Sequence, residues 1–142
     1  MKIAIIGLGL MGGSLGFCLK ENKLISCVYG MDLSKENEKD ALQLGLIHEL
    51  IEFKDLALCD MIFVATPVNA IIEILQKLVD LPSNITIIEL GSTKRKIIES
   101  LPKNLIKQTL FAHPMTGTEN SGPKAAFKEL YKDAVCVLCD SE

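Results

Sequence analysis

The sequence predicts an α/β fold of the doubly wound type, in which a mostly parallel sheet carries helices on both faces. Two patterns lead to this prediction: aliphatic runs alternate with amphipathic stretches along all 142 residues, and the connections between them are short. The apolar residues are mainly Ile, Leu and Val, with no Trp, and aliphatic runs are typical of strands buried on both faces. A chain of this length is expected to form one domain around one core.

The first half of the chain predicts a series of strand–helix units. Ser34 is expected to cap the second helix, and Gly45 is expected to end it. The strands are expected at 2–6, 27–32, weakly near 46–48, and at 60–65, and the helices at 11–21, 34–44, 55–59 and 68–79.

The second half continues the alternation. Strands are expected at 85–90, 109–112 and 134–139, and helices at 93–101 and 122–132. In doubly wound sheets, ligands bind outside the carboxyl ends of the strands. The polar residues expected just past strand ends therefore predict the site, and they are Asp32, Thr66, Ser92 and His113.

Charge and hydropathy exclude several classes of partner. The net charge is −3, and only Arg95 of the fifteen basic residues is an arginine, which gives no support for binding nucleic acid or an anionic membrane. No segment approaches the roughly 20 consecutive apolar residues of a membrane span. A cytoplasmic location is the resulting expectation.

Five cysteines are scattered along the chain, and only Cys136 and Cys139 have the spacing of a CxxC motif. Both belong to an expected strand, where an offset of three residues places side chains on opposite faces. Such a pair cannot share a metal ion, so we expect no metal site and reduced cysteines that act as small hydrophobic residues.

A Gly-Leu-Gly-Leu-Met-Gly run directly follows the first expected strand and opens the first expected helix. This context identifies G-x-G-x-x-G as the dinucleotide-binding turn of a Rossmann-type fold. Gly7 would allow the tight turn, Gly9 would let the backbone approach a pyrophosphate, and Gly12 would let the helix pack closely on the sheet. The N–H groups of Leu10 and Met11 would face the phosphates at the positive end of the helix dipole.

Asp32 ends the second expected strand, 20 residues after Gly12. A carboxylate there accepts hydrogen bonds from the ribose hydroxyls of adenosine and repels a 2′-phosphate. No arginine is nearby and Lys35 is the only early cation, so the cofactor is expected to be NAD rather than NADP. The alternative is that Asp32 only caps the next helix.

Thr66 and Pro67 follow the fourth expected strand and are assigned to the same cofactor site. Proline is common in the first turn of a helix, so Pro67 has a structural reason to be there. Thr66 would lie at the mouth of the site, where it either contacts the cofactor or caps the helix, and the sequence leaves both open. His48 has no polar neighbours in its segment and is expected to be structural.

Two further segments are polar where a core does not require it: 89–94, Glu-Leu-Gly-Ser-Thr-Lys, and 112–119, Ala-His-Pro-Met-Thr-Gly-Thr-Glu. The Gly-Ser-x-Lys and His-Pro-Met-x-Gly-x-Glu runs within them resemble the prephenate dehydrogenase family. With the glycine motif they cover essentially the whole chain in the family's order and spacing. The His-Pro-Met run is the most discriminating, because the glycine motif alone is shared by many dehydrogenases.

The resemblance implies roles for matching residues. His113 would accept a hydrogen bond from the substrate's ring hydroxyl and take its proton as hydride leaves, and neutral imidazole suits that task near pH 7. Ser92 would orient that hydroxyl, while Thr118, Glu119 and Lys94 would lie at the substrate mouth. From the residues alone, His113 could instead be structural, and Ser92 could be a helix cap.

The resemblance also implies a reaction and a missing part. The family oxidises and decarboxylates prephenate to 4-hydroxyphenylpyruvate with NAD, in tyrosine biosynthesis. Its members carry a second, helical domain that forms a homodimer and binds the substrate's carboxylates, which this chain lacks. We therefore expect the 142 residues to bind NAD and to turn over prephenate poorly or not at all. An arogenate dehydrogenase, another Rossmann dehydrogenase and a non-catalytic NAD-sensing module are the alternatives.

Overall fold

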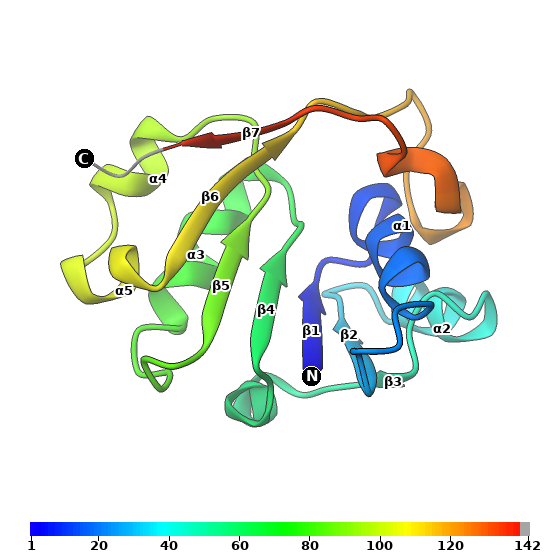
Figure 1. Ribbon diagram of the computed structural model, residues 1–142, viewed down its shortest axis with the longest axis horizontal. Helices are drawn as coiled ribbons and strands as arrows, with labels where there is room; N and C mark the ends of the chain where they lie inside the picture. The colour runs from blue at the N-terminus through cyan, green and yellow to red at the C-terminus, as the bar shows by residue number, and fades with distance from the viewer. Residues whose placement is uncertain (140–142) are drawn as a thin grey trace.

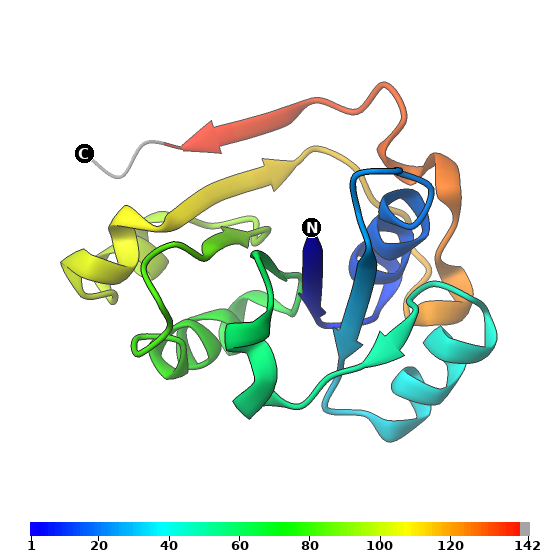
Figure 2. The ribbon, with the colours of Figure 1, turned by 60° about the horizontal axis from the view of Figure 1, so that its bottom comes forward.

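The computed structural model describes residues 1–139, which contain a seven-stranded sheet with the order β3-β2-β1-β4-β5-β6-β7 (Figure 1). Strands β1 to β6 pair in parallel, and β7 pairs antiparallel with β6 (Figure 2). The predicted mostly parallel, doubly wound sheet is confirmed. The strands are β1 Lys2–Ile6, β2 Cys27–Met31, β3 Glu49–Leu50, β4 Met61–Val64, β5 Thr86–Glu89, β6 Thr109–Pro114 and β7 Cys136–Cys139.

Helices cover both faces of this sheet, as the alternating pattern predicts. On one face lie α1 and α2, and on the other lie α3, α4 and α5. None of the helices in residues 1–139 is long and apolar enough to cross a membrane. The helices are α1 Leu10–Leu19, α2 Lys35–Gln43, α3 Val68–Lys77, α4 Arg95–Glu99 and α5 Lys103–Lys107, with 3-10 helices η1 Phe53–Leu58, η2 Pro123–Ala125 and η3 Lys128–Tyr131.

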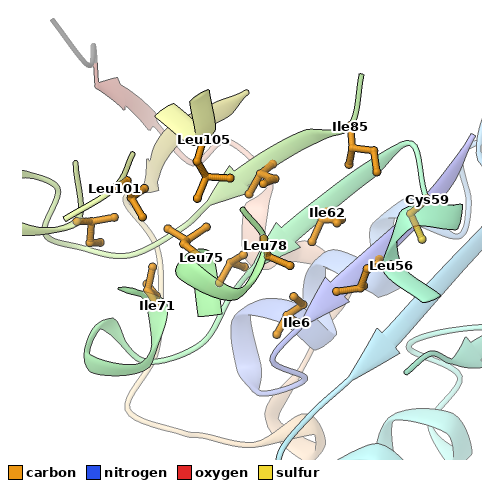
Figure 3. Close-up of a cluster of buried hydrophobic side chains, with 14 of the residues drawn as sticks. Ile6, Leu56, Cys59, Ile62, Ile71, Leu75, Leu78, Ile85, Leu101 and Leu105 are labelled. Atoms are coloured by element: carbon orange, nitrogen blue, oxygen red, sulfur yellow. The ribbon is translucent and has the colours of Figure 1, made fainter. Parts of the chain in front are cut away.

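The core has two halves because successive strand residues point to opposite faces. In β1, Ala4 and Ile6 pack with buried residues of α3, whereas Ile3 and Ile5 pack with the side of the sheet covered by α1 and α2. Figure 3 shows the first half, in which Ile71 and Leu75 of α3 lie over the strands. The strand ends stay available to a ligand, and on the α1 side the sheet face over β5, β6 and β7 is also open, where Leu110 and Leu138 are exposed.

The ends of α2 follow the sequence prediction. The Ser34 hydroxyl accepts a hydrogen bond from the N–H of Asn37 at 3.3 Å, which makes Ser34 the N-cap. Gly45 follows the helix with φ +68°, a left-handed conformation that glycine adopts without strain. Ser34 therefore takes the capping role that was the alternative for Asp32.

Three predicted elements were wrong in type or position. The strand expected near 46–48 begins at Glu49, because the Nδ1 atom of His48 accepts the N–H of Val28 at 2.9 Å in place of a strand carbonyl. This contact confirms that His48 is structural. The helix expected over 122–132 is two 3-10 helices separated by extended backbone at Ala126 and Phe127, where the Phe127 N–H bonds to Ser14.

The helix expected over 93–101 is confined to α4, and the one-turn helix α5 after Pro102 was not predicted. His113, expected just past a strand, lies inside β6 because this strand extends to Pro114 and pairs with β7. All five cysteines are free, and Cys136 and Cys139 belong to β7 as expected.

The connection from β6 to β7 crosses to the far side of the molecule and packs on α1, as the segment carrying η2 and η3 shows in Figure 1. The Tyr131 hydroxyl donates to the carbonyl of Met11 at 2.8 Å, and buried Ser14 accepts the N–H of Phe127 at 3.0 Å. We call residues 115–135 the strap. It joins α1, the helix that follows the glycine turn, to β6, the strand that contains His113.

Candidate functional site

A cleft of about 780 Å³ opens at the carboxyl ends of β1, β2 and β4. This is where sheet order reverses, between β1 and β4, and where doubly wound folds bind ligands. Its walls come from the turn after β1, the ends of β2 and β4, one side of α3, and the strap. The lining residues are Ile6, Gly7, Gly9, Leu10, Met11, Met31, Asp32, Leu33, Asn37, Phe53, Ala65, Thr66, Pro67, Ala70, Glu73, Ile74, Lys77, Asn120, Ser121 and Gly122.

The three glycines of the motif differ in what surrounds them. Gly7 has φ +96°, and a Cβ there would lie 2.8 Å from the carbonyl oxygen of Ala65. A Cβ on Gly12 would collide with the carbonyl oxygen of Gly7, so the first turn of α1 and the glycine turn touch through backbone. At Gly9 a Cβ would meet no protein atom within 4 Å. The space beside Gly9 is therefore open to a ligand.

The start of α1 presents free backbone donors to this space. The helix begins at Leu10 after Gly9, and no side chain caps it. The first N–H groups of a helix have no partner within the helix, and Leu10 and Met11, the first residues of α1, line the cleft. Unpaired donors at the positive end of a helix dipole form a binding site for phosphate oxygens.

The Asp32 carboxylate already accepts three hydrogen bonds. Its Oδ2 atom accepts the N–H of Leu8 at 2.7 Å, and Oδ1 accepts the N–H of Ser34 at 2.9 Å and the amide of Asn37 at 3.2 Å. A carboxylate offers about four acceptor positions, so about one remains for a ligand hydroxyl. The same contacts fix the side chain at the cleft wall and join the glycine turn to α2.

Thr66 and Pro67 lie on the opposite wall. Pro67 precedes the first residue of α3 and occupies the N-cap position, and no side chain caps that helix. Thr66 is therefore not the cap that the sequence left as an alternative. Its Oγ1 atom is buried and has no hydrogen-bond partner in residues 1–139. A buried hydroxyl without a partner is costly, and it identifies Thr66 as a donor or acceptor that a bound ligand can satisfy.

The outer part of the cleft is apolar. Phe53, Ala70 and Ile74 form one side, and Leu33, which is 97% exposed, stands at the rim of the other. Glu73 and Lys77 close this end as an ion pair 2.7 Å long, and the Lys77 ammonium holds the pKa of the Glu73 carboxyl below its usual value. The cleft thus has an apolar portion in addition to its polar glycine turn.

A second polar cluster lies at the ends of β5 and β6. The Glu89 side chain is fully buried and accepts hydrogen bonds from the N–H of Gly91 and from Lys94, whose Nζ is 2.7 Å away. Lys94 is 10% exposed and also donates to the carbonyl of Ala112 at 2.6 Å. The Gly-Ser-x-Lys motif thus has an internal structural use: its lysine neutralises a buried carboxylate and joins β5 to β6.

The residues with predicted catalytic roles lie around this cluster and not in the cleft wall. Ser92 is exposed in the turn between Gly91 and Lys94, and it does not cap α4, whose N-cap position is Lys94. His113 follows Ala112 in β6, is half-buried, and has a buried Nδ1 atom with no hydrogen-bond partner among the described residues. Lys94, through its bonds to Glu89 and to the Ala112 carbonyl, therefore joins the turn that holds Ser92 to the strand that holds His113.

The remaining residues predicted at the substrate mouth lie in the strap and in the buried pair with Glu89. Thr118 and Glu119 are exposed in the strap, where the Thr118 hydroxyl accepts the N–H of Asn120 at 3.2 Å. The roles of Thr118, Glu119 and Lys94 at a substrate mouth stay predictions.

The sequence prediction missed several lining residues: Asn37, Phe53, Ile74 and 120–122. The small polar run Asn-Ser-Gly at 120–122 is the sequence signal that could have identified the strap as a wall of the cleft.

Comparison with known proteins identifies the family. The model of the prephenate dehydrogenase nucleotide-binding domain matches residues 15–142, a region that holds both polar motifs. A prephenate dehydrogenase of Lactococcus lactis subsp. cremoris (strain MG1363) is 34% identical over 98% of this chain and 41% of its own length.

Two solved structures are also similar. The crystal structure of prephenate dehydrogenase from A. aeolicus in complex with hydroxyphenyl propionate and NAD+ has a TM-score of 0.89 and 30% identity, covering 99% of this chain and 50% of its own. Synechocystis arogenate dehydrogenase has a TM-score of 0.84 and 26% identity, covering 97% and 49%. The chain thus spans about half the length of these relatives, or less. It belongs to the family of prephenate dehydrogenase nucleotide-binding domains.

Proposed function

We propose that this chain binds NAD and is the cofactor half of an enzyme that oxidises and decarboxylates prephenate to 4-hydroxyphenylpyruvate, a step towards tyrosine. The observation that carries the proposal is the cleft. Its glycine turn, unpaired helix N–H groups and Asp32 provide a phosphate site and a ribose site at the switch point of the sheet. The A. aeolicus prephenate dehydrogenase, solved with NAD+, supports the choice of cofactor.

The described residues fit a dinucleotide on three counts. The open space at Gly9 has room for a pyrophosphate, and the start of α1 supplies donors to it. Asp32 retains about one acceptor position for a ribose hydroxyl. The unpartnered Thr66 hydroxyl and the apolar walls near Phe53 and Ile74 complete a site with both polar and ring-sized portions.

The chemistry we assign to the protein residues concerns the substrate's ring hydroxyl. When bound, the nicotinamide accepts the hydride that leaves the ring carbon bearing this hydroxyl. The His113 imidazole takes the hydroxyl proton as that C–H bond breaks, and the carbon–oxygen bond becomes a carbonyl. Loss of the ring carboxylate as carbon dioxide then makes the ring aromatic, and the proton returns to the oxygen. A positioned base of this kind contributes about 10²- to 10⁴-fold.

Ser92 and the Glu89–Lys94 pair are assigned supporting roles. Ser92 would hydrogen-bond the substrate hydroxyl beside His113. Glu89 and Lys94 would keep the two segments in register. Thr118 and Glu119 would lie where the substrate enters, on the strap.

Two further parts are needed: cations that bind the substrate's two carboxylates, and an interface for a homodimer. We propose that a helical second domain provides the cations for those carboxylates and a homodimer interface, and that residues 1–142 alone turn over prephenate poorly. Arogenate is the second candidate substrate, which the likeness to Synechocystis arogenate dehydrogenase favours.

The first experiment is a calorimetric titration of the 142-residue chain with NAD and, separately, with NADP. Saturable binding with a preference for NAD is the expected result, because Asp32 repels a 2′-phosphate. Absence of binding to both nucleotides would contradict the proposed cofactor site.

A second experiment separates an enzyme from an NAD-sensing module. His113→Asn is made in a chain that carries the second domain, and both NAD affinity and prephenate turnover are measured. We expect unchanged NAD affinity and a loss of most of the turnover. An unchanged rate would contradict the assignment of His113 as the base.

A further inference from the structure

The turn between β2 and α2 separates two hollows, and the charged residues beside it are sorted between them. The cleft lies on one side and is lined here by Asp32, Leu33 and Asn37. A hollow of about 480 Å³ lies on the other side, and Lys35 and Glu38 line it together with Glu52 and Asp55. Lys35, the cation nearest in sequence to Asp32, therefore faces away from the cleft.

Glu38 holds Lys35 in that position. Its Oε2 atom is 2.8 Å from the Lys35 Nζ, and its other oxygen, Oε1, accepts the N–H of Asp32 at 3.2 Å. The Glu38 side chain is 8% exposed, whereas the Lys35 side chain is 87% exposed. One buried carboxylate thus contacts both the backbone of the ribose-binding residue and the cation beside it.

We propose that Glu38 is a specificity-determining residue that strengthens the preference for NAD over NADP by keeping Lys35 away from the 2′ position of the adenosine ribose. This inference rests on the proposed NAD site. A 2′-phosphate near Asp32 requires a cation to accommodate it. If Lys35 moved to the phosphate, Glu38 would remain as a buried carboxylate without its cation, which is unfavourable.

The surroundings of Lys35 add to this effect. Glu52 and Asp55 line the same hollow as Glu38, so Lys35 faces three carboxylates there. Lys54 pairs with Glu52 at 2.7 Å, but Glu38 and Asp55 remain for Lys35. On the cleft side lies the Asp32 carboxylate, which repels a phosphate. Selectivity thus has two parts: direct repulsion by Asp32, and removal of the available cation by Glu38.

Glu38→Gln tests the second part alone. Glutamine keeps an oxygen that can accept the Asp32 N–H but loses the charge that attracts Lys35. In calorimetric titrations of the 142-residue chain at low salt, we expect NADP to bind about fivefold to tenfold more tightly, since exposed pairs are worth up to about 1 kcal/mol and removal of a negative charge adds to this. The NAD affinity should change by less than about twofold.

The matched control is Glu36→Gln, which removes an exposed carboxylate in the same first turn of α2. It should change NADP affinity by less than about twofold. Lys35→Met supplies the second test. On its own it should leave NADP affinity unchanged. In the double variant Glu38→Gln/Lys35→Met it should abolish the tighter NADP binding expected of Glu38→Gln, so the two substitutions should be non-additive.

The outcomes separate the inference from the proposed function. If the native chain binds no NAD, the cofactor assignment fails and this inference fails with it. If the native chain prefers NAD and Glu38→Gln improves NADP binding no more than Glu36→Gln does, only the inference is overturned. If Glu38→Gln does not fold, as judged by loss of its far-UV circular dichroism signal, the test is Lys35→Met alone. Unchanged NADP affinity in that variant is the expected result, and a clear loss of NADP affinity would overturn the inference.

Discussion

The two ends of the sheet differ in how completely they form a site. Around β1, β2 and β4, the predicted cofactor residues other than Gly12 line one cleft, in which the Asp32 carboxylate is hydrogen-bonded and the space beside Gly9 is open. Around β5 and β6, Ser92 is exposed, Lys94 is engaged by Glu89, and the Nδ1 atom of His113 has no partner among the described residues. The first region is a formed cleft, whereas in the second the charged groups are held in a buried pair.

This difference reflects sequence distance. The glycine turn and Asp32 belong to one β-α-β unit, so their spacing alone fixes their geometry. Ser92 lies in the turn after β5 and His113 in β6, and Lys94 joins these two segments through its bonds to Glu89 and to the Ala112 carbonyl. We therefore expect a substitution in the glycine turn to be able to change NAD affinity without changing stability, and substitutions in the Glu89–Lys94 pair to change mainly the free energy of unfolding.

The largest effect is expected at Lys94. Lys94→Met leaves the fully buried Glu89 without its cation, and breaking a buried pair costs about 3–5 kcal/mol of unfolding free energy. Urea unfolding followed by circular dichroism measures the loss. Lys96→Met, an exposed residue of α4, is the control and should change stability little.

The double variant Glu89→Gln/Lys94→Met sharpens this test. It removes both charges and should recover part of the lost stability, because no buried charge is left unpaired. A double variant as unstable as the sum of the two single variants would show that the charges do not act as a pair.

Two glycine substitutions come next in size. Gly12→Ala places a methyl group against the Gly7 carbonyl, which should cost about 1–3 kcal/mol of stability and displace the glycine turn. Gly9→Ala meets no protein atom within 4 Å and should leave stability unchanged, while its methyl group fills the space for the ligand. In parallel melts and NAD titrations, Gly12→Ala should change both readouts and Gly9→Ala only NAD affinity. Normal NAD binding by Gly9→Ala would place the pyrophosphate elsewhere.

A smaller effect is expected at the junction of the two regions. Ser14→Ala removes the acceptor for the Phe127 N–H and should lower the unfolding free energy by about 1 kcal/mol. Ser83→Ala, at an exposed position, is the matched control in the same urea titration. Equal stability of these two variants would mean that the strap is held to α1 without this hydrogen bond.

The smallest effect depends on pH. Burial raises the pKa of the Tyr131 hydroxyl above its ordinary value of 10.0. Above pH 10 the unfolded chain therefore loses this proton before the folded chain does, and stability falls as pH rises. Between pH 10 and 11 the native chain should lose about 1 kcal/mol more stability than Tyr131→Phe does. Cys59, whose pKa burial raises to about 11, is present in both proteins, so parallel slopes would exclude a contribution from Tyr131.

Sequence predicted the fold and the nucleotide site because both depend on local patterns. The G-x-G-x-x-G turn, Asp32 and the cap at Ser34 occur within one stretch of chain, and each has a backbone reason for its residue type. The outer wall of the cleft could not be predicted, because Phe53 and Ile74 look like ordinary core residues in the sequence.

Long-range contacts explain the remaining errors. Residues 122–132 of the strap were predicted as one helix, but the hydrogen bond from the Phe127 N–H to Ser14 lies where that helix is interrupted. His113 lies inside β6 because β7, formed from distant residues, extends the ladder to Pro114. Lys94 was predicted from a family motif, but its pairing with Glu89 depends on the burial of Glu89 in β5, which lies beside β6.

The reversed direction of β7 has a practical consequence for engineering. Cys136 pairs with Pro114 and Cys139 with Phe111, so β7 starts at the cleft edge of the sheet and runs back from it. β1 starts at the opposite edge, near Met1, and runs towards the cleft. A reporter protein or surface anchor fused before β1 would thus be joined away from the nucleotide cleft, whereas Cys139 at the end of β7 is in register, through Phe111, Glu89 and Val64, with Ile6 at the cleft. Attachment through the start of β1 would leave the proposed NAD site open for titration, which would suit the chain to use as the recognition element of an NAD biosensor.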